Sequence, residues 1–260
     1  TDTCPIVCTV PLWVSDILPS HFSKRRGKKH FPMSGINWQE KSPSEFVTYN
    51  TDQGTLSAHY HRPFTVTSPA FITCFPKLGL QEDLDKSQEL DITMKGAGET
   101  QQQFRQWLDA MDTKLLEFVH AHPRVLQGTG STFKKPPSLD QLEVMLKRAF
   151  KPRVSTKTGR TYPDSMVCRF KPGRNWGDEQ LLVLDADLNA IAPDAVGYNH
   201  MVRVHLVYNG TYCRGGSFGN SWALQAVQTF GPAHSIMTPA PTPADMFSGR
   251  PEDEAFPVLS

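Results

Sequence analysis

The sequence lacks long apolar runs, a paired set of cysteines and any strong excess of charge. No stretch approaches the roughly 18 apolar residues of a membrane-spanning helix, so no transmembrane segment is expected. The five cysteines are odd in number and widely spaced, which excludes a disulfide framework and favours a reducing, intracellular compartment. Lys and Arg total 27 against 26 Asp and Glu, so the whole chain is almost neutral.

Signatures of nucleotide-binding and hydrolytic enzymes are missing as well. The chain has no GxxxxGK[ST] phosphate loop and no GxGxxG after a strand. Ser221 in the stretch GNSWA precedes a strand-like run, whereas a nucleophile elbow needs its serine on a strand-to-helix turn. Cys4 and Cys8 could ligate a metal, but a four-ligand zinc site needs two more partners. The candidates are the pairs His59 and His61, and His120 and His122, and the second pair lies two apart on a predicted helix and so points to different faces. We therefore expect no enzyme activity, no metal and no cofactor.

The near-neutral total hides a sorting of charge along the chain. Residues 147–174 carry nine basic side chains against Asp164 alone, and residues 24–29 read KRRGKK. The last 29 residues instead hold four acidic side chains against Arg250. Charge sorted in this way indicates an anionic partner for one face of the molecule and an acidic tail.

Two segments have helical periodicity. Apolar side chains spaced by three and four residues from Phe104 to Val119 predict an amphipathic helix over 100–122, which Pro123 ends. Ser138 and Gln141 form a capping box ahead of a shorter predicted helix that runs to Phe150.

The other periodic segments alternate like strands. The predicted strands are 64–75 (bent at Pro69), 89–95, 166–171, 181–184, 200–208 and 221–230, with turn residues between them. Short strands with a helical insert predict a mainly β, α+β chain, an OB-fold-like antiparallel barrel. The predicted organisation is an irregular N-terminal extension (1–60), the OB-like domain (61–230, insert about 99–150) and a disordered, acidic, Pro-rich tail (231–260).

Basic and aromatic residues coincide in the second half of the chain. Cations that follow phosphates and aromatic rings that stack on bases together hold single-stranded nucleic acid. In the predicted strand 200–208, Arg203 and His205 share the face opposite the apolar side chains. The candidate nucleic-acid contacts are Lys151, Arg153, Lys157, Arg160, Tyr162, Arg169, Lys171, Arg174, Trp176, Arg203, His205, Tyr212, Arg214 and Phe218. Tyr212, Arg214 and Phe218 are predicted to lie on a mobile loop hinged at Gly215 and Gly216, whereas Trp222 is assigned to the core.

Residues from about 60 to 230 resemble the single-stranded DNA-binding proteins of large nucleocytoplasmic DNA viruses, of the poxvirus and algal-virus type. The resemblance is carried by the order of the strands and by matching positions at Gly159, Tyr162-Pro163, Arg169, Lys171, Tyr208, Gly219 and Trp222. It implies an OB-fold core, binding of single strands without sequence specificity, and service to genome replication, recombination and repair. The stretch GTYCRGGS is longer than the family's turn, and residues 1–60 match nothing in it.

The resemblance also implies partners and a location. An acidic tail of this kind recruits replication proteins, and its candidate docking residues here are Asp253, Glu254, Phe256 and Leu259. Self-association on DNA is a further candidate interaction, and no membrane partner is expected. A viral protein of this type would act in the host cytoplasm, at a replication factory, or in the nucleus.

Two other functions stay open at this point. A viral structural or scaffold β-protein would use apolar surfaces to pack against copies of itself. A metal-dependent nuclease would centre on Asp185 and Asp187, because such enzymes hold Mg²⁺ with carboxylates.

Overall fold

The structure is a computed structural model. It describes residues 34–45, 47–52, 55–59, 64–74, 76–79, 88–129, 136–154, 158–171, 181–214 and 216–233. The strands are β1 (Ser34–Ile36), β2 (Thr48–Asp52), β3 (Thr55–His59), β4 (Phe64–Thr67), β5 (Phe71–Thr73), β6 (Gln88–Thr93), β7 (Lys151–Val154), β8 (Thr161–Phe170), β9 (Leu182–Leu184), β10 (His200–Arg214) and β11 (Ser217–Pro232). The helices are α2 (Glu99–Ala121) and α3 (Leu139–Met145), with 3-10 turns η1 (Pro43–Glu45), η3 (Pro123–Thr129) and η4 (Pro193–Ala195).

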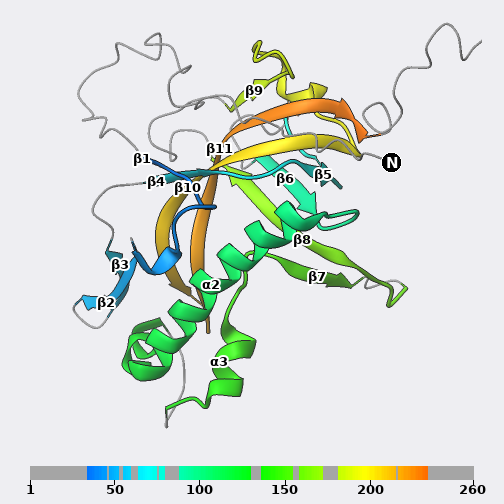
Figure 1. The fold of residues 1–260 in the computed structure, drawn as a ribbon. Helices are drawn as coiled ribbons and strands as arrows, with labels where there is room; N and C mark the ends of the chain where they lie inside the picture. Colours follow the sequence, from blue (N-terminus) through cyan, green and yellow to red (C-terminus); the bar gives the residue numbers. More distant parts are fainter. Residues whose placement is uncertain are drawn as a thin grey trace, which may run out of the picture.

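The main sheet follows the order β1-β4-β10-β5-β6-β8-β7, and β11 pairs with β10 and with β9 (Figure 1). The residues just before β7 return to β11, where Leu146 forms a parallel bridge with Phe218. The amide of Lys147 donates to the Phe218 carbonyl at 2.8 Å. Backbone contacts therefore run round a closed circuit of strands, as in a small barrel.

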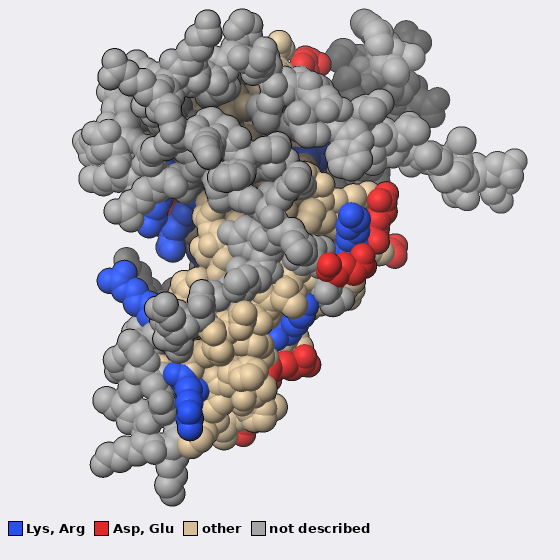
Figure 2. Space-filling model, turned by 90° about the vertical axis from the view of Figure 1, so that its left-hand side faces the viewer, with Lys and Arg blue, Asp and Glu red and all other residues tan. Residues whose placement is uncertain are grey.

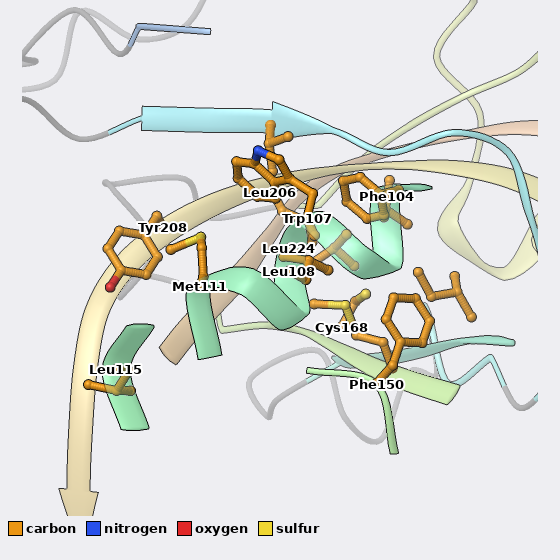
Figure 3. Packing of buried hydrophobic residues seen from close by; sticks show 14 of the residues in the cluster. Phe104, Trp107, Leu108, Met111, Leu115, Phe150, Cys168, Leu206, Tyr208 and Leu224 are labelled. Atoms are coloured by element: carbon orange, nitrogen blue, oxygen red, sulfur yellow. The ribbon is translucent and has the colours of Figure 1, made fainter. Parts of the chain in front are cut away.

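The amphipathic helix α2 covers the sheet as its periodicity predicts. Its buried side chains include Phe104, Leu108, Met111 and Leu115, and they pack with Leu206, Tyr208 and Leu224 of the two longest strands (Figure 3). Full burial of side chains of this size stabilises the fold by roughly 1.5–3 kcal/mol each. The helical insert is thus an integral part of the core.

The second helix is shorter than its sequence predicts. The capping box is present, because Ser138 Oγ accepts from the Gln141 amide and Gln141 Oε1 accepts from the Ser138 amide. The helix ends at Met145, since the next residue joins the backbone circuit with Phe218. Residues 146–150 therefore lead into β7 and do not extend α3.

Each predicted strand is present, but the strand predictions were incomplete: β7 was not predicted, and β8 begins at Thr161 and not at Met166. Pro69 separates β4 from β5, as expected, but β10 and β11 extend much further toward each other than 200–208 and 221–230. From residue 34 onward the predicted irregular extension also contributes strands, since β1 pairs in parallel with β4.

The fold class is confirmed as mainly β with a helical insert, an OB-like α+β arrangement. No helix in the described part of the chain is long and apolar enough to cross a membrane.

Candidate nucleic-acid interface

One face of the β6–β8 pair carries charge because the strands alternate. Leu90 and Ile92 of β6 lie opposite Cys168 and Met166 of β8, and all four are buried in the core. The intervening residues project from the other side of the sheet, which we call the outward face. The residues of β6 and β8 on this face are Glu89, Asp91, Thr93, Ser165, Val167 and Arg169.

Two ion pairs lie on the outward face. Arg169 Nε is 2.7 Å from Glu89 Oε1, and the two residues are direct partners in the β6–β8 ladder. A terminal nitrogen of Arg153 is 2.7 Å from Asp91 Oδ2. The Arg169 side chain is 57% exposed, whereas the Asp91 side chain is only 7% exposed. Burial raises the pKa of Asp91, while the neighbouring Arg153 opposes that rise.

A β-bulge turns Tyr162 onto the same outward face. Lys151 pairs with Ser165, and Arg153 pairs with Tyr162, so β8 has one residue more than β7 between the two pairs. Without that extra residue, Tyr162 would share the inward side of Met166; bulges commonly re-aim a side chain in this way. Tyr162 is 46% exposed, and the Arg160 guanidinium lies 5.8 Å from the centre of its ring.

A second exposed tyrosine lies near the end of β10. Tyr212 pairs with Gly219 of β11, and its ring lies so close that a Cβ at residue 219 would be 3.0 Å from the Tyr212 hydroxyl and 2.8 Å from the Lys147 carbonyl. Burial and the charge of Asp112 raise the pKa of the Tyr212 hydroxyl, and Arg169 lowers it. Tyr212 is therefore within electrostatic reach of Arg169 while remaining 38% exposed.

The predicted mobile loop is wrong, because its residues are paired strand. Tyr212, Cys213 and Arg214 pair with Gly219, Phe218 and Ser217. Alternation points Tyr212 and Arg214 outward and turns Phe218 into the core, where it is fully buried. Phe218 cannot stack on a base from there. Of the two proposed hinge residues, Gly216 takes the positive φ of a tight turn, and Gly215 lies outside the described residues.

The contact predicted for His205 does not fit its surroundings either. His205 Nδ1 is 2.8 Å from Thr67 Oγ1, and burial lowers its pKa to about 4. The imidazole is therefore neutral near pH 7 and supplies no positive charge to a phosphate. Arg203 lies on the same face of β10 as His205, and its guanidinium carbon is 5.6 Å from the centre of the Phe230 ring. Along β10 it is eleven residues away from Arg214.

Several candidates lie outside the described residues. They are Lys157, Arg174, Trp176 and the tail residues Asp253, Glu254, Phe256 and Leu259. Cys4, Cys8 and the basic stretch 24–29 lie outside them too.

The carboxylate proposed for a nuclease is engaged by its own loop. Asp185 Oδ1 accepts from the amides of Asp187 and Asn189, both at 2.9 Å, and the contacts with Asn189 lower the pKa of Asp185. This is an Asx-type turn after β9. Among the described residues, no three His, Cys, Asp or Glu side chains are grouped so that they could hold a metal ion.

The outward face thus gathers cations and tyrosines from strands that are distant in sequence. Its exposed cations and rings are Lys151, Arg160, Tyr162, Arg169, Lys171, Tyr212 and Arg214. Figure 2 shows the molecule from the left-hand side of Figure 1, and in this view the Lys and Arg side chains along the left edge have no acidic side chain of the described residues beside them. Guanidinium and ammonium groups bind phosphates, and exposed tyrosine rings stack on bases at roughly 1–3 kcal/mol per base.

Sequence reasoning missed three features of this face. Glu89 and Asp91 were not among the candidate residues, although pairing with β8 puts them beside the arginines. Lys147, whose carbonyl adjoins Gly219, joins the hairpin only through the closure of the circuit. The contacts of these three residues depend on how the strands pair, and a single sequence does not specify that register.

Comparison with protein-family models gives no match, and comparison with curated protein sequences gives no significant match. Among solved structures, the chain is similar to gp2.5, a single-stranded DNA-binding protein encoded by bacteriophage T7, with 14% identity and a TM-score of 0.39. That match covers 65% of this chain and 92% of the other. The single-stranded DNA-binding protein of bacteriophage Enc34 in complex with ssDNA matches with 11% identity and a TM-score of 0.38, over 72% and 96% of the two chains. These structure matches are to phage proteins and not to proteins of nucleocytoplasmic DNA viruses.

Proposed function

We propose that the protein binds single-stranded DNA without sequence specificity and performs no chemistry on it. One observation carries the proposal: exposed Arg and Lys side chains share the outward face of the β6–β8–β7 strands with the exposed Tyr162, and the exposed Tyr212 projects from the β10–β11 hairpin within electrostatic reach of Arg169. Cations there would hold phosphates, and Tyr162 and Tyr212 would stack on bases. The same proposal includes a role in genome replication, recombination and repair. It also includes the viral family and the recruitment of replication proteins by the C-terminal tail.

The face suits a single strand better than a duplex. Duplex readers commonly insert a helix or a two-stranded ribbon into the major groove. Here the candidate contacts project from the surface of a curved sheet, and both tyrosines offer ring faces that stacked duplex bases could not reach. Base stacking of this kind tolerates any sequence, because every base has a π-face.

Fluorescence anisotropy with labelled oligo-dT and with a duplex of equal length, at two salt concentrations, tests the proposal. Binding of the single strand should exceed that of the duplex and should weaken steeply with salt, by a slope of about −0.7 for each phosphate neutralised. Lys171→Gln should lower the magnitude of that slope by about 0.7, the contribution of one phosphate, whereas Arg124→Gln, on η3 away from the face, should leave it unchanged. Binding no tighter than tens of micromolar at low salt, on the order of weak non-specific association, would overturn the proposal.

A further inference from the structure

The outward face has two ends of similar composition, separated by a neutralised middle. The first end is Lys171, Tyr212 and Arg214, and the second end is Lys151, Arg160 and Tyr162. The middle consists of the ion pairs Arg169–Glu89 and Arg153–Asp91. We propose that one single-stranded segment is held at both ends and crosses the middle with few phosphate contacts, an inference that rests on the proposed function.

The first end is formed where β8 meets the β10–β11 hairpin. Lys171 follows β8 directly and shares the outward parity of Arg169. Tyr212 and Arg214 alternate outward on β10, and the absence of a Cβ at Gly219 lets the Tyr212 ring lie close against β11. The ring is therefore held in place on one side and exposed on the other, which is the arrangement that a stacking platform needs.

The second end is formed at the other end of β8, on the hairpin with β7. In Figure 1 this hairpin projects to the right of the molecule, while the β10–β11 hairpin descends toward α2 and α3. Tyr162 reaches the outward face only through the bulge in β8, and Arg160 lies over its ring. Lys151 projects from the same side, two residues before Arg153. This end therefore repeats the combination of one ring and two cations.

The middle differs because its arginines already have anionic partners. Arg169 and Arg153 are each 2.7 Å from a carboxylate oxygen, so the four side chains together carry no net charge. Carboxylates repel phosphates, and a nucleic-acid strand gains little by replacing an existing ion pair. Attraction is consequently concentrated at the two ends.

The separation of the ends sets a minimum length for a bridging strand. Lys171, directly after β8, and Tyr162 are nine residues apart, which is about 26 Å after allowing for the bulged residue. A stacked strand advances about 3.4 Å per nucleotide, so about eight nucleotides are needed to bridge this distance. A shorter oligonucleotide would contact only one end at a time.

A length series of oligo-dT tests the inference on the full chain. We would measure affinity for about 4, 8, 12 and 16 nucleotides, the range of site sizes of such folds. Wild-type affinity should rise about tenfold or more once both ends are bridged, because the second contact becomes intramolecular. Tyr162→Ala and Tyr212→Ala should each abolish that step, yet each should change the affinity for the shortest oligonucleotide by less than about threefold.

Tyr198→Ala is the matched control, since Tyr198 is an exposed tyrosine in the loop before β10 and belongs to neither end. It should keep the wild-type length dependence, and thermal melting should show that all three variants are folded. The two-point contact would be overturned if Tyr162→Ala and Tyr212→Ala lost the same affinity at every oligonucleotide length, or if Tyr198→Ala also lost the length-dependent step. Either result would leave single-strand binding itself intact. If the wild type binds no oligo-dT of any length, the proposed function itself fails and this inference fails with it.

Discussion

Asn220 donates a hydrogen bond from Nδ2 to Oδ1 of Asp112 at 2.9 Å, and this bond joins β11 to α2 inside the core. The amide oxygen of Asn220 accepts from the hydroxyls of Tyr49 and Tyr208, also at 2.9 Å each. Asp112 Oδ2 accepts in turn from the Ala149 amide. One polar cluster therefore connects β2, α2, β10, β11 and the segment before β7, and it supports the hairpin that carries Tyr212.

Replacing Asn220 should destabilise the whole domain. In Asn220→Ala, a buried carboxylate and two buried hydroxyls lose a partner, and unsatisfied groups of this kind cost about 1–3 kcal/mol each. We expect the free energy of unfolding, measured by urea titration, to fall by about 3 kcal/mol. Gln106→Ala on the exposed side of α2 should change it by less than about 0.5 kcal/mol. A loss for Asn220→Ala as small as that would show that water replaces the side chain.

The Asp112 carboxyl should make stability fall as the pH rises through weakly acidic values. Burial raises its pKa to about 6 despite the donors Asn220 and Ala149, whereas in the unfolded chain it is about 3.9. Between these values the folded state holds a proton that the unfolded state has released, so this group contributes less stability at pH 7 than at pH 4. Relative to Asp112→Asn, the wild type should lose on the order of 2 kcal/mol of unfolding free energy across that range. A relative gain instead would mean that the ionised carboxylate is the preferred buried form.

His205 should act in the opposite direction. Burial lowers its pKa to about 4, below its unfolded value of about 6.5, so the unfolded state takes up a proton first as the pH falls. Its contribution to stability should be complete above pH 6.5 and should be lost progressively toward pH 4. His205→Gln should remove this dependence and leave the salt slope of DNA binding at pH 7 unchanged. A reduced slope would show that a charged His205 contacts phosphate.

The core elements could be predicted because their periodicity is local. Helix α2, the break at Pro69 and the capping box at Ser138 each depend on residues within a few positions of one another. The shortened α3 could not be predicted, because Leu146 is drawn out of the helix by Phe218, a partner 72 residues away.

The candidate site was predicted in composition but only partly in geometry. The positions of Arg169 and Lys171 on an outward face follow from simple alternation along β8. Tyr162 reaches that face only because of a bulge, and Phe218 leaves the expected loop because strand pairing with Cys213 continues to the turn. Bulges and register depend on the partner strand, so no pattern within one segment encodes them.

Phe218 and Tyr212 should therefore respond in opposite ways to truncation. Phe218 is fully buried, and Phe218→Ala should lower the free energy of unfolding by about 3–5 kcal/mol. Tyr212→Ala should lower it by only about 1 kcal/mol, but for an oligo-dT long enough to bridge both ends it should weaken binding by an amount equal to the loss of one stacked base, roughly 1–3 kcal/mol. Urea titration and anisotropy on both variants give the two readouts. If Tyr212→Ala proved as destabilising as Phe218→Ala, the ring would be a core residue and not a binding residue.

The two ion-paired arginines should likewise separate stability from binding. Asp91 is almost fully buried, so Arg153→Gln leaves its carboxylate without the paired guanidinium. The substitution should lower the free energy of unfolding by about 3 kcal/mol and raise the pKa of Asp91 further. Arg169 and Glu89 form a more exposed pair, and Arg169→Gln should cost less than about 1 kcal/mol. Glu89→Gln completes the comparison, because it releases Arg169 to a phosphate and should increase the salt slope of oligo-dT binding by about 0.7. Urea titration and salt-dependent anisotropy would measure these effects, and a Glu89→Gln variant that binds more weakly than wild type would show that Glu89 orients Arg169 for its contact with DNA.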